Sequence, residues 1–127
     1  MSSFRTYETE MTEQDTLCKV LTEQQLKFTV HPQPVKLKGW GSALAEIVIP
    51  KGAHGNLADI GFAKVDGRFR MIRADDDHLS AKLIEREYAV RKTKDLAGAN
   101  GMRFVSREAV KTDRGFQTKL IFEPRSN

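Results

Sequence analysis

Apolar and polar residues alternate most regularly in two adjacent stretches, residues 57–65 and residues 68–75. Only Asp66-Gly67 separates the two stretches. Asp-Gly between alternating stretches predicts a tight β-hairpin, because both positions of the favoured turn require a positive φ angle. We therefore predict an antiparallel hairpin as part of a small α+β domain.

The two-residue turn also fixes which side chains share a side of this hairpin. The side expected to meet the core carries Ile60, Phe62, Lys64, Phe69 and Met71, with Phe62 opposite Met71 and Lys64 opposite Phe69. The other side carries a mixed set of residues, which are Asp59, Gly61, Arg68, Arg70 and Ile72.

The remaining pattern predicts two helices and five further strands. Strands are expected over residues 4–11, 27–30, 43–49, 104–111 and 116–123, and helices over residues 13–25 and 79–99. Residues 12–15 resemble a capping box before the first helix, with Asp in the usual place of Glu or Gln. The strand over residues 27–30 is expected to stop at Pro32 and Pro34, because proline donates no backbone hydrogen bond.

These elements give the order β-α-β-β-β-β-α-β-β, which we interpret as an α+β fold in a single domain over residues 1–127. Both helices are expected to pack on one face of a single antiparallel sheet, which leaves the other face open and available for function. The predicted core residues come from both helices and the central strands, and they are Leu17, Leu21, Ile47, Ile49, Phe62, Phe69, Met71, Ile84 and Tyr88.

Composition narrows the function only slightly. The 127 residues carry a net charge of +4, and the isoelectric point is near 9.3. This is a weak sign of nucleic-acid binding, because acidic residues are mixed among the basic ones. The single cysteine, Cys18, excludes an internal disulfide and indicates a reducing, cytoplasmic location. No apolar run approaches the ~20 residues of a membrane span, so no membrane partner is expected.

Candidate chemistry is sparse. Asp75-Asp76-Asp77-His78 offers oxygen ligands for a hard metal ion, but we favour capping of the second helix, because acidic residues suit the positive end of a helix. The histidines, His31, His54 and His78, have no second His or Cys at ligand spacing. Cys18 falls on the apolar side of the first helix, which indicates an inert thiol. We therefore predict no metal site, no cofactor and no catalytic residue.

Two features indicate a surface for a protein partner. Gly39-Trp40-Gly41 leaves Trp40 without bulky neighbours, so that Trp40 either packs on the sheet or anchors a partner. Gly61 leaves a gap in the side-chain layer, which marks either a bulge or bend, or the close approach of a ligand or another backbone. The residues expected to bind the partner are Trp40, Asp59, Gly61, Arg68 and Arg70.

Basic residues support an alternative function, an RNA- or DNA-binding domain that uses the open sheet face. In the second helix, basic residues alternate with Glu85, Glu87 and Asp95, which is typical of a solvated helix with ion pairs four residues apart. A face that contacts phosphates is the other interpretation. The residues of this alternative are Arg68, Arg70, Arg86, Arg91 and Lys92.

Short motifs along the chain resemble, in the same order, those of a known family. They are Ser2-Ser3-Phe4, Lys38-Gly39-Trp40-Gly41, Ala45-Glu46-Ile47-Val48-Ile49, Asp59-Ile60-Gly61-Phe62, a strand ending at Asp75, and Tyr88-Ala89. The chain thus resembles the hypothetical chloroplast open-reading-frame family number thirty-five, a domain of unknown function in plastids and cyanobacteria. The resemblance implies an accessory role beside an AAA-type ATPase. We therefore expect a non-catalytic interaction module that binds a protein partner.

Overall fold

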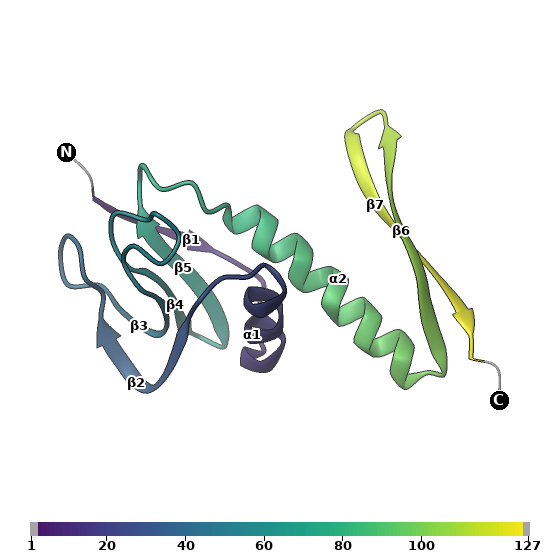
Figure 1. Ribbon diagram of the computed structural model, residues 1–127, viewed down its shortest axis with the longest axis horizontal. Helices are drawn as coiled ribbons and strands as arrows, with labels where there is room; N and C mark the ends of the chain where they lie inside the picture. Colours follow the sequence, from purple (N-terminus) through teal and green to yellow (C-terminus); the bar gives the residue numbers. More distant parts are fainter. Residues whose placement is uncertain (1–2, 126–127) are drawn as a thin grey trace. The chain divides into compact units, whose positions relative to one another are not determined.

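The computed structural model describes residues 3–125, so Ser2 of the first family motif lies outside the described residues. Figure 1 traces the elements, which follow the predicted order and confirm the α+β class. They fall into two compact units, which are divided within the second helix between Tyr88 and Ala89. In chain order the elements are β1 (Phe4–Glu8), α1 (Gln14–Glu23), β2 (Thr29–Lys36), β3 (Leu44–Ile49), β4 (Ile60–Val65), β5 (Arg68–Ala74), α2 (Ala81–Ala99), β6 (Met102–Thr112) and β7 (Gly115–Pro124).

The first unit contains a five-stranded antiparallel sheet in the order β1-β5-β4-β3-β2. Asp66 and Gly67 have φ angles of 52° and 81°, so β4 and β5 are joined by the predicted tight turn. Phe62 lies opposite Met71, which confirms the predicted register. The local turn chemistry is therefore sufficient to align these two strands.

One face of this sheet meets residues from both helices. Leu17 and Leu21 of α1 belong to the same buried cluster as Ile84 and Tyr88 of α2. Within the first unit, helical residues therefore cover one sheet face, as predicted. Every predicted core residue is buried in this cluster, namely Leu17, Leu21, Ile47, Ile49, Phe62, Phe69, Met71, Ile84 and Tyr88.

The start of α1 differs from the predicted capping box. Glu13 is the N-cap residue, and its side chain makes no capping hydrogen bond to the backbone. Instead, the hydroxyl of Tyr88 accepts the N–H groups of Glu13 and Thr12, across 2.9 Å and 3.3 Å. The backbone N–H groups at the start of α1 thus find their acceptor on the other helix.

No helix within residues 3–125 is long and apolar enough to cross a membrane.

Pro32 and Pro34 do not end β2, contrary to the prediction. The strand continues to Lys36 at one edge of the sheet. Val30 pairs with Ile47 and Val35 pairs with Ala45, so residues 31–34 leave the regular ladder between them. Proline is tolerated at such a place, because edge strands and bulges leave some N–H groups without a ladder partner.

The second unit contains the end of α2 and the β6–β7 hairpin. In the described part of the chain β6 and β7 form a separate two-stranded sheet, which corrects the predicted single sheet. The rings of Phe104 and Phe122 meet edge to face with centroids 5.9 Å apart, and Lys94 Nζ lies 3.9 Å from the centroid of Phe104. The backbone N–H and C=O groups that face each other between β6 and β7 form hydrogen bonds within the hairpin. These groups therefore need no third strand.

Candidate functional site

The loop between β2 and β3 presents Trp40. Gly39 in this loop has a φ angle of 152°, and a Cβ there would lie 2.6 Å from the Phe4 ring and 2.9 Å from Cβ of Ala58. The ring of Trp40 meets the ring of Phe4 edge to face, with centroids 6.1 Å apart. Trp40 nevertheless remains 40% exposed. The indole is therefore both held in place and accessible to a partner.

Asp59 holds this loop from the inside and is only 5% exposed. One carboxylate oxygen accepts the N–H of Lys38 and the other accepts the N–H of Lys51, both across 2.7 Å. Asp59 also donates its own N–H to the Lys38 carbonyl across 2.8 Å. Because Lys38 precedes Gly39 and Trp40, Asp59 fixes the position of the loop. The structure thus places Asp59 beneath the surface that we expected it to form.

The sheet face opposite the helices is covered rather than open, which corrects the expectation. Leu37 lies over Gly61, where a Cβ would be 2.8 Å and 2.9 Å from the two Leu37 methyl carbons and 2.6 Å from Cβ of Ala45. The gap at Gly61 is therefore filled by the chain's own side chains. A second buried cluster lies here, and it consists of Leu37, Ala45, Val48, Ala63 and Ile72.

Arg68 and Arg70 are accessible, but each is paired with a glutamate. Arg68 Nη1 lies 3.2 Å from Glu10 Oε1, and Arg70 Nε lies 2.8 Å from Glu8 Oε1. These carboxylates cancel the two positive charges locally. A polyanion approaching this part of the sheet would meet a nearly neutral surface.

The residues of the expected partner surface do not all come together. Phe4, which packs on Trp40, begins β1, whereas Glu8, which pairs with Arg70, ends it. Strand geometry places these two ends about 13 Å apart. The Trp40 loop is therefore a site separate from the arginines of β5.

Arg86 and Arg91 of α2 each form an ion pair with an acidic residue of the same helix. Arg86 Nε lies 3.6 Å from Glu87 Oε2, and Arg91 Nη2 lies 2.9 Å from Asp95 Oδ1, four residues along the helix. Lys92 is exposed on the same helix. The Arg91–Asp95 pair has the four-residue spacing typical of a solvated helix, the first of the two interpretations.

The acidic stretch before α2 forms a turn and does not cap the helix, contrary to the expectation. Ser80 Oγ accepts the N–H of Leu83 across 3.1 Å, so Ser80 provides the cap. Asp77 Oδ1 instead accepts the N–H of His78 across 2.8 Å. Within residues 3–125, no group of three or more His, Cys, Asp or Glu residues could hold a metal ion.

A pocket of about 260 Å³ lies in the first unit, where residues 54–56 meet residues 77–79. His54 Nε2 accepts the N–H of Lys27 across 2.9 Å, so this nitrogen is occupied. The Asn56 amide donates to the carbonyls of Pro50 and Ala58. These polar groups therefore hold the surrounding loops. The rest of the lining is mainly apolar and includes Leu26, Ile49, Ile60 and Leu79.

The thiol of Cys18 is poorly suited to act as a nucleophile. Burial, and secondly the negative charge of Asp15, raise the pKa of the Cys18 thiol above its usual value. A raised pKa lowers the fraction of reactive thiolate at neutral pH. This agrees with the inert thiol expected on the apolar side of α1.

Comparisons with known proteins found no matching family model, no similar curated protein and no similar solved structure. The family resemblance based on short motifs therefore remains a prediction. Two residues that shape the candidate site, Phe4 and Leu37, were not among the predicted site residues. Their apolar character was visible, but only the fold shows that Phe4 supports Trp40 and that Leu37 covers Gly61.

Proposed function

We propose that this chain is a non-catalytic interaction module whose Trp40 loop binds a protein partner. The observation that supports this most is the 40% exposure of Trp40 on a loop that is already fixed. Tryptophan is enriched among the residues that dominate binding energy at interfaces. A loop fixed before binding loses little conformational freedom when the partner arrives.

The support beneath the loop strengthens this proposal. Asp59 ties Lys38 in place through two hydrogen bonds, and Phe4 packs against the indole from the start of β1. Substitution of Asp59 would therefore disturb the loop as well as the fold. Trp40 is the better position for testing the surface itself.

The family resemblance indicates which partner to test first. It implies an accessory subunit beside an AAA-type ATPase, so we propose that class of protein as the partner. The chain contains a single tryptophan, so the fluorescence emission of Trp40 reports directly on its own loop. Binding of an ATPase from the native host at this loop is expected to change that emission.

The test compares the affinity of Trp40→Ala and of the parent for this ATPase by isothermal titration calorimetry. Loss of an interface tryptophan typically costs about 2 kcal/mol or more, so Kd is expected to rise about thirtyfold. Leu96→Ala is the matched control, because Leu96 is also an exposed large hydrophobic residue, at 67%. This control is expected to bind like the parent.

Thermal melts of the same variants separate binding from folding. Trp40→Ala is expected to melt close to the parent, because over a third of Trp40 is already exposed. A loss of several kcal/mol of stability would place Trp40 in the core and contradict the proposal. Unchanged melting together with unchanged binding would show that the partner surface lies elsewhere.

A further inference from the structure

The positive charge of the chain is concentrated in the second unit. Residues 89–127 contain nine Lys and Arg against four Asp and Glu, whereas residues 1–88 contain twelve against thirteen. The second unit therefore carries a net charge of +5 and the first a net charge of −1. Such concentration of positive charge is the electrostatic footprint of a unit that binds polyanions.

The β6–β7 register sorts these charges onto two faces of the hairpin. On one face, Arg103 forms an ion pair with Glu123, and Glu108 lies opposite Lys119, so the charges are balanced. The paired positions of the other face, from the Phe104–Phe122 pair to the Lys111–Phe116 pair, contain no Asp or Glu. We name this the aromatic-basic face, and its large and charged residues are Phe104, Arg107, Lys111, Phe116, Leu120 and Phe122.

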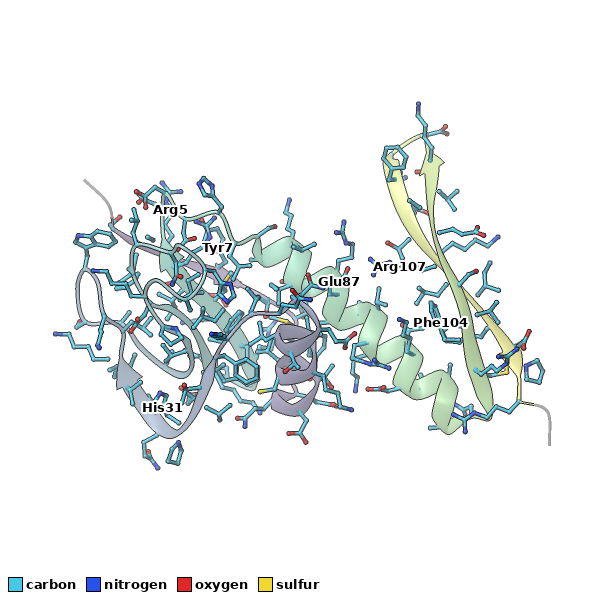
Figure 2. All side chains as sticks on the ribbon, viewed as in Figure 1. Arg5, Tyr7, His31, Glu87, Phe104 and Arg107 are labelled. Carbon is cyan, nitrogen blue, oxygen red and sulfur yellow. The ribbon has the colours of Figure 1, made fainter. Side chains whose placement is uncertain are left out.

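A bulge in β6 is necessary for this arrangement. Phe104 pairs with Phe122 and Ser106 pairs with Ile121, so Val105 is an extra residue without a partner. The bulge returns Arg107 to the face that carries Phe104. Figure 2 shows Phe104 and Arg107 extending from β6 on the same side of the hairpin.

An exposed ring lies beside a lysine near the turn of the hairpin. Phe116 is 75% exposed and lies directly opposite Lys111 on the aromatic-basic face. An aromatic ring can stack on a nucleic-acid base, and a nearby ammonium group can neutralise a phosphate. Proteins that bind single strands combine these two features. The turn itself, formed by Asp113 and Arg114, adds no net charge.

We propose that the aromatic-basic face binds single-stranded nucleic acid, with Phe116 stacking on a base and Lys111 contacting a phosphate. Charge complementarity favours a polyanion, since the paired positions of this face contain basic residues but no Asp or Glu. The exposed ring favours unpaired bases, because the bases of a duplex already stack on one another. This site is independent of the Trp40 loop and can be correct whether or not that loop binds a protein.

Fluorescence anisotropy of a labelled oligothymidine with the full chain tests the proposal between about 50 and 200 mM salt. The parent is expected to bind, and its affinity is expected to fall steeply as salt increases. Lys111→Gln is expected to reduce the slope of log K against log salt by about 0.7, the value for one single-strand phosphate. Phe116→Leu is expected to weaken binding about fivefold or more without changing this slope.

Lys119→Gln is the matched control, because it removes one positive charge from the balanced face of the same hairpin. It is expected to leave the salt slope unchanged, and Trp40→Ala is expected to bind the oligonucleotide like the parent. Circular dichroism confirms that each variant is folded. Equal changes in the salt slope for Lys119→Gln and Lys111→Gln would overturn the proposal. The attraction would then depend on the total positive charge of the hairpin and not on the aromatic-basic face.

Three other outcomes would also overturn it. The first is failure of the parent to bind the oligonucleotide at low salt. The second is an unchanged affinity of Phe116→Leu, which would exclude stacking. The third is equal or tighter binding of a duplex or of polyglutamate, which would indicate duplex binding or an acidic protein partner instead.

Discussion

The outer face of the five-stranded sheet leaves no room for a Cβ at position 61. Such an atom would lie 2.6 Å from Cβ of Ala45 and within 2.9 Å of both Leu37 methyl carbons. Both neighbours are fully buried, so neither can turn into solvent without disrupting the cluster. Gly61→Ala is therefore expected to lower the free energy of unfolding by about 1–3 kcal/mol, the usual cost of overpacking, as measured by urea denaturation.

Gly98 in the last turn of α2 provides the matched control. A Cβ there would meet only Arg125 Nη2, at 3.5 Å, which is an ordinary contact. Alanine is favoured over glycine within a helix by up to about 1 kcal/mol, so Gly98→Ala is expected to keep or raise the stability. A Gly61→Ala variant as stable as the parent would mean that Leu37 can move aside, and the packing explanation would be wrong.

At the scale of elements, the start of α1 depends on a side chain from α2. Tyr88→Phe keeps the ring in the core and removes only the hydroxyl that accepts from Thr12 and Glu13. We expect the free energy of unfolding to fall by about 1 kcal/mol, because backbone donors lose their protein acceptor. Thermal denaturation followed by circular dichroism measures this loss.

Tyr7→Phe is the control for this helix prediction. The ring of Tyr7 lies under Arg73, with 4.7 Å between its centroid and the guanidinium carbon, and phenylalanine preserves that contact. Within the described residues the Tyr7 hydroxyl makes no hydrogen bond, so the stability is expected to stay near that of the parent. Equal losses for both variants would show that the Tyr88 hydroxyl has no special role at the start of α1.

At the scale of the whole molecule, the exposed edge at β2 affects whether copies of the chain associate. Edge strands can pair with strands of another copy, and prolines discourage such pairing. Pro32 and Pro34 lie in the irregular part of β2. Replacement of both by Thr is expected to increase self-association, measured as the light-scattering mass at rising concentration. Gln33→Thr is the control, and an unchanged mass of the double variant would contradict a protective role of the prolines.

Local signals account for the parts of the fold that the sequence predicted. The Asp66-Gly67 turn sets the register of β4 and β5, and strict alternation then places Phe62 and Met71 in the core. The spacing of Leu17 and Leu21 similarly places both on the buried side of α1. Each of these inferences needs only neighbours within a few residues along the chain, and the tertiary packing agrees with them here.

The candidate site was only partly predictable. The flanking glycines made Trp40 a candidate, and the structure leaves its side chain 40% exposed. The sequence placed Asp59 and Gly61 on the side of the hairpin that was expected to be open. Alternation shows which side of a strand a residue lies on, but it does not show whether that side is covered by other parts of the chain. The concentration of charge from Ala89 onward is visible in the sequence, but the placement of Phe104 on the same hairpin face as Arg107 depends on the bulge at Val105.

By itself the sequence determined the order of the elements, the central hairpin and one buried face, because turn chemistry and periodicity act locally. Only the tertiary structure decided which side chains cover the other face of the five-stranded sheet. It also decided which residues form hydrogen bonds with Asp59 and Tyr88. Leu37 reaches Gly61, Asp59 reaches Lys38, and the hydroxyl of Tyr88 reaches Glu13. These contacts join residues 21 or more positions apart, which no local pattern encodes.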